Sequence, residues 1–233
     1  MKILLWSLLK RQGEKRLQWS RFGRDLDRMT TLEEFDRYVA ATNPSDFLFY
    51  EKASLGKRQE IQLVLDTLGI DVSGKAALDI GPGYGDALDE FHQRGARDVA
   101  FIEYDPFFFT LNRLKEFTRG YRANHLRKLT LFEADAFDFI WIKGSIREDL
   151  FMGVFGWLFS LPKWLKKVRR ILAPGGTVVL CPYWSSSGDQ RLVQDARHSS
   201  FTETILDQGY DVLPHLDGHN TEPNYPITFI LKD

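Results

Sequence analysis

The sequence predicts an α/β fold: a doubly wound, seven-stranded, mostly parallel sheet with an N-terminal helical extension. Three observations support this prediction. From Lys75 onward, short apolar runs alternate with segments of helical periodicity, which is typical of a parallel sheet. The first of these runs ends in a glycine-rich turn at residues 81–85. The length of 233 residues suits one such domain with an appendage. We therefore assign residues 1–58 to the extension and residues 59–233 to the sheet domain.

The extension begins with a basic, amphipathic segment. Residues 1–24 carry seven lysines and arginines against one glutamate, interleaved with leucines and a tryptophan. Such a segment could lie on an anionic membrane or another polyanion, or it could pack on its own domain or on a second copy in a homodimer. We favour packing. No small-residue cleavage site follows the apolar start, so we expect no secretory signal.

Two more helices are predicted in and after this extension. Thr30-Thr31-Leu32-Glu33-Glu34 has the pattern of a capping box at a helix start. A second helix is expected from about Lys57 to Leu68. The turn Asn43-Pro44-Ser45-Asp46 separates them.

Apolar runs predict where the seven strands lie. One candidate, residues 139–142, competes with residues 150–155 for the fourth strand. We prefer the later run, because the helix that precedes Pro174-Gly175-Gly176 then follows without a long gap. The expected strands are near residues 76–80, 99–103, 129–133, 150–155, 176–181, 210–214 and 227–231.

The glycine-rich turn indicates a nucleoside-like ligand. Residues 81–85 read G-x-G-x-G, and bare backbone at such a turn lets a ligand approach closely. The dinucleotide fingerprint needs a glycine at position 86, where this chain has Asp86. A pyrophosphate would also be repelled by Asp79 and Asp86. The turn therefore favours a nucleoside without phosphates.

An acidic residue at the end of the second strand completes this pattern. Glu103 lies 18 residues beyond Gly85, close to the spacing of about 20 at which an acid binds the ribose hydroxyls. A carboxylate accepts hydrogen bonds from both hydroxyls at once. Asp105 is the rival, but Pro106 after it favours a turn.

Together these segments resemble the class I S-adenosylmethionine-dependent methyltransferases. The family's first motif, an acid, a small apolar residue and G-x-G-x-G, is matched by Asp79 to Gly85, and its L-x-P-G-G turn by Leu172 to Gly176. The resemblance covers about residues 60–233. It implies the Rossmann-like methyltransferase fold, methyl transfer as the activity and S-adenosyl-L-methionine as the cofactor.

The resemblance also assigns cofactor contacts. It gives Glu103 to the ribose and Tyr104 to the adenine face. From the segment expected to be the third strand, Asp135 would accept from the adenine amino group and the Ala136 amide would donate to the ring, although Asp135 could also cap a helix. The predicted cofactor-binding residues are Asp79, Gly81, Gly83, Gly85, Glu103, Tyr104, Asp135 and Ala136.

The acceptor is expected outside the carboxyl ends of the fourth and fifth strands. Aromatic residues after those strands could form its walls, and in this family a segment before the first strand often folds over the cofactor as a lid. Phe47 and Phe49 could line such a lid. The predicted substrate-binding residues are Tyr50, Trp157, Tyr183 and Trp184. The candidate bases are His198, His215 and His219, of which we name His198 and His215 as catalytic; His92 and His125 are expected on the wrong faces.

Residues 156–159 argue against several acceptors. They lack the N/D-P-P-Y motif of adenine- and amide-nitrogen methyltransferases, and they lack the carboxylates of metal-dependent catechol enzymes and aminopropyl transferases. We therefore expect no metal, and a small-molecule, glycan or lipid-linked acceptor that offers a hydroxyl, amine or carbon. An RNA or protein acceptor, or a non-catalytic cofactor-binding protein, stays open as an alternative.

Composition sets further bounds. The net charge of −1 gives no strong signal for nucleic acid. The single cysteine, Cys181, is expected to be buried in the fifth strand, which excludes a disulfide framework and fits a reducing compartment. No apolar run reaches the length of a membrane span. The expected location is cytoplasmic, and peripheral at the inner membrane surface if residues 1–24 bind lipid.

Overall fold

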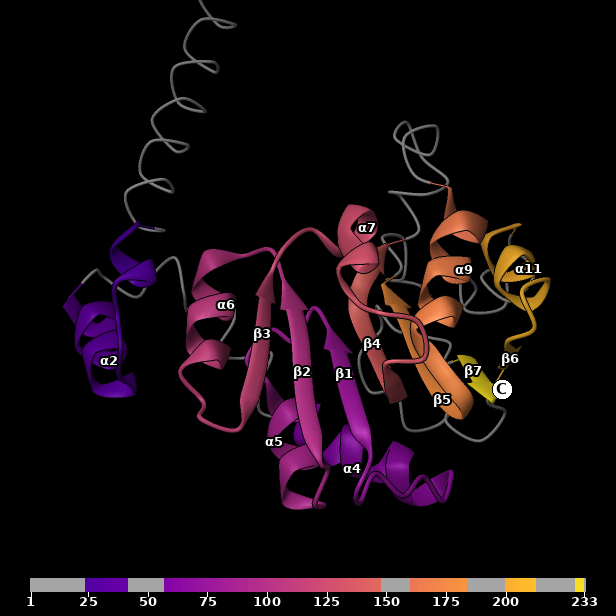
Figure 1. The fold of residues 1–233 in the computed structure, drawn as a ribbon, viewed down its shortest axis with the longest axis horizontal. Coiled ribbons are helices and arrows are strands. Elements are labelled where there is room, and N and C mark those ends of the chain that lie inside the picture. Colours follow the sequence, from indigo (N-terminus) through magenta and orange to yellow (C-terminus); the bar gives the residue numbers. More distant parts are fainter. Residues whose placement is uncertain (1–23, 42–56, 148–159, 184–199, 213–228, 233) are drawn as a thin grey trace, which may run out of the picture.

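The fold is taken from a computed structural model, which describes residues 24–41, 57–147, 160–183, 200–212 and 229–232. A seven-stranded sheet with the order β3-β2-β1-β4-β5-β7-β6 runs through the middle of the molecule, with helices packed on it (Figure 1). The strands β1 to β5 are parallel, and β7 is antiparallel to both of its neighbours. The strands are β1 (Ala76–Ile80), β2 (Asp98–Glu103), β3 (Thr118–Arg122), β4 (Phe137–Arg147), β5 (Leu172–Tyr183), β6 (Asp211–Val212) and β7 (Phe229–Lys232).

Helices cover both faces of the sheet, which confirms the predicted doubly wound class. Within β1, Leu78 and Ile80 face one core layer that includes residues of α9, and Ala77 faces another that includes α4 and α5. This alternation follows from the two-residue period of a strand. The helices are α2 (Leu32–Ala41), α4 (Lys57–Thr67), α5 (Asp86–Gln93), α6 (Pro106–Arg113), α7 (His125–Lys128), α9 (Leu161–Ile171) and α11 (Ser200–Leu206), with a 3₁₀ turn η2 (Leu129–Leu131).

The sheet has a topological switch point at β1. From β1 the chain builds outward through β2 to β3, and it then returns to place β4 on the other side of β1. In open α/β sheets, ligands bind outside the carboxyl ends of the strands at such a point. The glycine turn at residues 81–85 follows the carboxyl end of β1 and therefore lies at this position.

Two of the predicted strands were wrong. The third strand is Thr118–Arg122, whereas residues 129–131 form the turn η2. The fourth strand is Phe137–Arg147, which contains the rejected candidate 139–142, and residues 150–155 lie outside the described part of the chain. The other five strands agree with the prediction within a few residues, and Cys181 is buried as expected.

The described part of the N-terminal extension packs against α6. Leu26, Met29 and Phe35 form a buried cluster with Phe107 and Phe108 of that helix. The predicted capping box is present at the start of α2: the Glu34 amide donates to Thr31 Oγ1 at 3.2 Å, and the Thr30 amide donates to the Glu34 carboxylate at 2.8 Å. The lid residues Phe47, Phe49 and Tyr50 lie outside the described residues, so a lid stays a prediction.

Candidate functional site

All three glycines of the turn have positive φ angles, of 77°, 55° and 80°. Most side chains are strained in this region, whereas glycine is not. At two of them a Cβ would also collide with neighbours. At Gly81 it would lie 2.6 Å from Ser145 Cβ, and at Gly85 it would lie 1.9 Å from Asn112 Oδ1. These two positions therefore need glycine for the fold itself.

Gly83 differs from the other two glycines. A Cβ built at Gly83 would have no atom within 4 Å. Packing within the described residues therefore does not explain a glycine here. Its φ of 55° already favours glycine, and the open space beside it also suits a ligand that approaches the backbone, because a side chain would hold such a ligand away.

Glu103 lies against this turn. Its Oε1 accepts from the backbone amides of Tyr104, at 2.7 Å, and Asp105, at 2.8 Å, and the Gly83 amide also donates to the carboxylate. Burial raises the pKa of Glu103 to about 7, and the three amide donors act in the opposite direction. The structure thus brings Gly83 and Glu103 together, as the sequence predicts for a ribose site.

Neighbouring residues fit their expected places. The Tyr104 side chain is largely exposed beside the turn, so its ring is accessible to a planar ligand. Asp105 caps α6 by accepting from the amide of Phe107, and its role is thus the turn that Pro106 favours. Asp79 is 2% exposed and lies on the sheet face that α4 and α5 cover, beneath the turn. Cofactor contacts by Asp79 and Tyr104 stay predictions.

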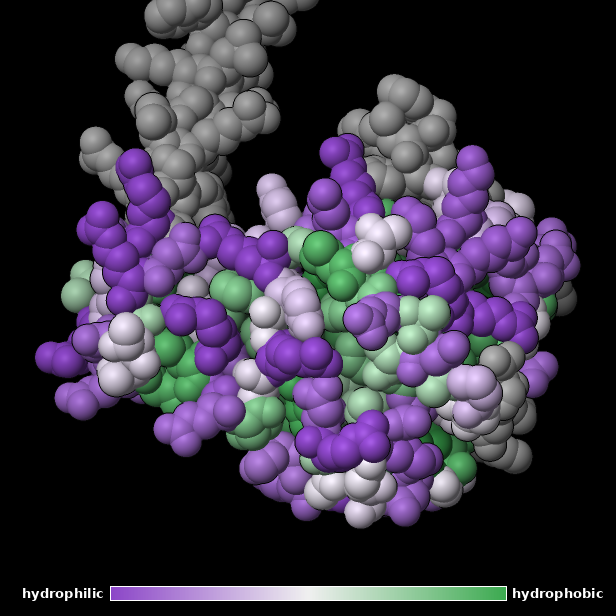
Figure 2. Space-filling view, in the orientation of Figure 1, coloured by the Kyte–Doolittle hydropathy of each residue, from purple (hydrophilic) through white to green (hydrophobic). Residues whose placement is uncertain are grey.

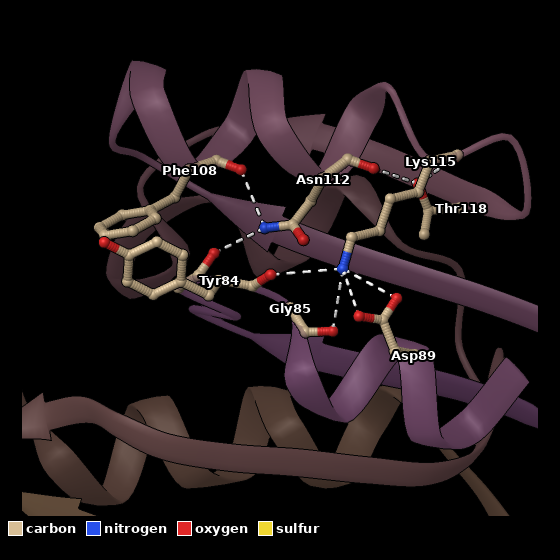
Figure 3. A network of polar contacts seen from close by, with 8 residues as sticks. Tyr84, Gly85, Asp89, Phe108, Asn112, Lys115 and Thr118 are labelled. Carbon is tan, nitrogen blue, oxygen red and sulfur yellow. Dashed lines mark hydrogen bonds and ion pairs between the residues drawn. The ribbon is translucent and has the colours of Figure 1, made fainter. Parts of the chain in front are cut away.

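The sequence analysis does not predict the contribution of α6 and of the residues that follow it. Asn112 Nδ2 donates to the carbonyl oxygen of Gly83 at 2.7 Å, and Lys115 Nζ donates to the carbonyl oxygens of Tyr84, at 3.3 Å, and Gly85, at 3.2 Å (Figure 3). Lys115 also forms an ion pair with Asp89 of α5 at 2.9 Å. No motif marks Asn112 or Lys115, because they act on backbone atoms that any sequence would supply.

Asp135 and Ala136 do not reach the turn, so their predicted adenine contacts are wrong. They directly precede β4, and Phe139 pairs with Ala77 near the amino end of β1. Since a strand rises about 3.3 Å per residue, Asp135 lies about 20 Å from the glycine turn. Its amide donates to the carbonyl of Arg170, and its φ of 56° belongs to a tight turn.

The loop after β3 takes the position expected for the adenine contact. The Ala123 amide donates to the Glu103 carbonyl at 3.0 Å, which places this loop beside the ribose candidate. Asn124 follows and caps α7 by accepting from the Leu126 amide at 3.0 Å. Ala123 and Asn124 thus lie beside the ribose candidate, where the sequence analysis expects Asp135 and Ala136.

His125 also lies at this edge of the sheet, contrary to the expectation that it sits on the wrong face. Its ring makes a hydrogen bond with the backbone of Ser145, and the Ser145 hydroxyl donates to the carbonyl of Ile80 at the end of β1. Burial lowers the pKa of His125 to about 4, so the imidazole is neutral at pH 7. Its Nδ1 is buried without a hydrogen-bond partner in the described structure.

Most predicted acceptor-side residues lie outside the described residues. These are Tyr50, Trp157, Trp184, His198, His215 and His219. The backbone of Tyr183 is described: it pairs with Arg147 at the carboxyl ends of β5 and β4, where the acceptor was expected. Among the described residues, no cluster of three metal-ligating side chains is found, and no helix is long and apolar enough to cross a membrane.

Comparisons with known proteins agree with this geometry. A family model for the methyltransferase domain matches residues 52–210. The fold is similar to that of a methyltransferase from Aquifex aeolicus that depends on S-adenosylmethionine (TM-score 0.52, 16% identity, 81% of this chain and 96% of that chain). It is also similar to a Methanococcus maripaludis protein assigned to the same class (TM-score 0.53, 10% identity, 88% and 94%). No curated protein matches the sequence significantly.

The family model covers most of the sheet domain, including the glycine turn, Glu103 and the loop after β3. The strand order and the switch-point turn are those that the resemblance implies. The protein belongs to the class I S-adenosylmethionine-dependent methyltransferases, and its cofactor is S-adenosylmethionine.

Proposed function

We propose that the protein methylates a small-molecule, glycan or lipid-linked acceptor at a hydroxyl, amine or carbon. The observation that carries the proposal is the sequence at the corrected end of the fourth strand. Lys143-Gly144-Ser145-Ile146 has no N/D-P-P-Y pattern, so the resemblance gives no support for a planar nucleobase or amide nitrogen as acceptor. The segment lies beside Gly81 and hence next to the cofactor turn.

The chain's own part in the reaction is to hold and align. The cofactor supplies a methyl group on a sulfonium, which already carries a good leaving group. In this proposal Glu103 accepts from the ribose hydroxyls, which is supported by its contact with the Gly83 amide and by the open space beside Gly83. Alignment of the acceptor with the methyl carbon at about 3 Å, with water excluded, supplies the rest of the rate enhancement.

The end of β4 brings carboxylates back among the candidate groups. Residues 156–159 contain none, but the residues that follow β4 directly in the sequence are Glu148 and Asp149. These two lie outside the described residues. Metal-assisted methylation of a catechol-like hydroxyl therefore remains within the proposed class of acceptors. A rate that depends on added Mg²⁺, and that falls in Asp149→Asn, would identify this variant of the chemistry.

We further propose that the loop Ala123–Asn124 replaces Asp135 and Ala136 as the adenine contact. The side-chain oxygen Oδ1 of Asn124 has a second lone pair beyond the one that accepts from the Leu126 amide, and the adenine amino group is a donor. Wild-type protein should bind S-adenosylhomocysteine more tightly than its inosine analogue, which lacks that amino group. Asn124→Leu should narrow this difference; equal discrimination in both proteins would contradict the assignment.

The acceptor is tested directly with methyl-labelled cofactor and fractionated cell extract. We expect label in small-molecule, glycan or lipid fractions with wild-type protein and none with Glu103→Ala. Label confined to RNA or protein would overturn the proposed acceptor class. Cofactor binding by calorimetry without transfer to any fraction would favour a non-catalytic binding protein.

A second candidate, an RNA acceptor, is favoured by a basic surface on α9 and α7. Along α9, Lys163, Lys166 and Arg170 are exposed at helical spacing, and Arg170 donates to the carbonyl of Phe132 beside η2. Arg127 and Lys128 of α7 continue this surface, and hydrophilic residues dominate the α9 side in Figure 2. Lys163→Glu with Lys166→Glu should remove label from RNA, and should leave label in small molecules unchanged.

A further inference from the structure

Three successive carbonyl groups of the cofactor turn are held from one side. Asn112 Nδ2 binds the oxygen of Gly83, and Lys115 Nζ binds those of Tyr84 and Gly85. In Figure 3 both side chains point from α6 and the residues after it toward the turn. Asn112 is fully buried, and the Lys115 side chain is 12% exposed. Contacts this well shielded from water are stronger than the same contacts at the surface.

The two side chains are themselves fixed. Asn112 Nδ2 also donates to the carbonyl of Phe108 at 2.9 Å, one helical turn earlier, which sets the orientation of its amide. Lys115 is held by both carboxylate oxygens of Asp89 at 2.9 Å. The single Thr118 hydroxyl hydrogen is shared between the carbonyl oxygens of Asn112 and Lys115, at 2.5 and 2.9 Å from Oγ1, so the backbone that carries both side chains is also held in place.

Holding the carbonyl groups also directs the amide groups. The peptide bonds of the described residues are all trans, and in a trans peptide the carbonyl and the following N–H point in opposite directions. With the carbonyls of Gly83 and Gly85 directed at α6, the amides of Tyr84 and Asp86 point away from it. The Gly85 amide is used within the turn, since it donates to the carbonyl of Pro82.

We propose that Asn112 and Lys115 are positioning residues for the cofactor: they shape the turn at residues 83–85 before the cofactor arrives. This rests on the cofactor assignment made above. A turn held in its bound shape loses less conformational freedom on binding, so the benefit appears in cofactor affinity. Neither residue needs to touch the cofactor for this effect.

Lys115→Met tests the proposal because methionine keeps most of the apolar stem but donates no hydrogen bond. The dissociation constant of S-adenosylhomocysteine should rise about tenfold, as expected when two hydrogen bonds that order a binding loop are lost. Asn112→Ala should act like Lys115→Met.

Arg94→Met provides a matched control at the end of α5, the helix that carries Asp89. Arg94 is a partly buried cation that pairs with Glu90 of α5 at 2.7 Å and with Asp66 at 2.8 Å, and neither of these carboxylates belongs to the turn. Arg94→Met should lower the unfolding temperature without changing the affinity for the cofactor. If Arg94→Met weakens cofactor binding as much as Lys115→Met at an equal loss of stability, the positioning role is wrong.

A cofactor-free measurement separates this proposal from the cofactor assignment. Hydrogen exchange at the amides of residues 84–86 in the empty protein should be about tenfold faster in Lys115→Met and unchanged in Arg94→Met. Unchanged exchange in Lys115→Met would overturn the positioning role even if binding is weaker. Failure of the wild-type protein to bind S-adenosylhomocysteine would instead overturn the cofactor assignment, and the exchange data would still decide whether the turn is held.

Discussion

At the scale of single residues, the three positions of the turn require glycine for different physical reasons. Gly81 and Gly85 leave room for Ser145 and Asn112, which are parts of the protein. At Gly83 the space that a side chain would take is not filled by any atom of the described structure. A shared sequence motif therefore combines two folding requirements with one that we attribute to the ligand.

Alanine substitutions should separate these requirements. Gly83→Ala should fold, with a loss of about 1–2 kcal/mol for the left-handed backbone, and should lose cofactor binding. Gly85→Ala should be much less stable, because its methyl group would overlap Asn112 Oδ1. Thermal unfolding and calorimetry with S-adenosylhomocysteine measure the two effects. Normal cofactor affinity in Gly83→Ala would show that the space beside this residue is ordinary solvent.

Glu103 should make cofactor binding depend on pH. Its carboxyl group, with a pKa of about 7 in the empty protein, must be ionised to accept from both ribose hydroxyls. The dissociation constant of S-adenosylhomocysteine should therefore rise about tenfold between pH 8 and pH 6. Glu103→Gln should bind more weakly at pH 8 and show a flat profile. An identical slope in both proteins would assign the pH dependence to another group.

At the scale of secondary-structure elements, α6 connects the N-terminal extension to the cofactor turn. Phe35 of α2 contacts Phe107 with ring centres 5.0 Å apart, and Tyr84 of the turn packs edge-on against Phe107 and Phe108. Arg113, the last residue of α6, donates to the carbonyl of Met29 at 2.8 Å. One helix thus packs against the extension and also holds the turn.

Truncation of Phe35 tests this connection. Phe35→Ala should cost about 3 kcal/mol of unfolding free energy, because Phe35 is almost fully buried. It should also weaken cofactor binding several-fold, since Phe107 and Tyr84 lose their support. Leu165→Ala, in the core layer on the other face of the sheet, is a control with a similar expected loss of stability. Equal cofactor affinity in the two variants would show that the extension does not act on the turn.

The elements that the sequence predicted well are those with strong local signals. The glycine turn, the capping box and the amphipathic helix α9 each follow from a few neighbouring residues. The third strand was missed because residues 118–122 are polar and only partly buried, as suits an edge strand. Leu129 and Leu131 flank a threonine as in a strand, but at the turn η2 the buried side chains are Leu129 and Phe132, and Leu131 is exposed.

The same limit explains the errors at the site. The adenine contact was assigned to Asp135 because residues 129–133 were predicted as the third strand, whereas that strand is Thr118–Arg122. Asn112 and Lys115 could not be found, since their partners are carbonyl groups about 30 residues away in the sequence. The position of Glu103 beside the glycine turn agrees with the prediction, because it depends only on the length of one helix and one strand; its contact with the ribose stays a prediction.

At the scale of the whole molecule, Glu103 and His125 affect stability in opposite directions. The pKa of Glu103 is raised from 4.5 to about 7, so its contribution to stability is lost as the pH rises through that range. The pKa of His125 is lowered from 6.5 to about 4, so stability is lost as the pH falls through that range. Between pH 4.5 and pH 6.5 the two effects oppose each other.

Glu103→Gln should therefore remove the opposing effect and leave the contribution of His125 to the pH dependence of stability. Its unfolding free energy should fall relative to wild type, by about 1.4 kcal/mol for each pH unit, as the pH is lowered from 6.5 to 4.5. Urea unfolding at several pH values measures this difference. Parallel profiles for the two proteins would mean that the carboxyl group of Glu103 titrates near its ordinary value in the folded state.

The polar strand β3 has a consequence for copies of this protein at high concentration. It forms one border of the sheet, and its arginines are occupied: Arg119 pairs with Asp98, and Arg122 pairs with Asp27 of the extension. The opposite border, β6, has only two residues. Within the described residues, neither border offers a long apolar template, so these two borders give strand-by-strand stacking of molecules into fibrils no favourable starting point.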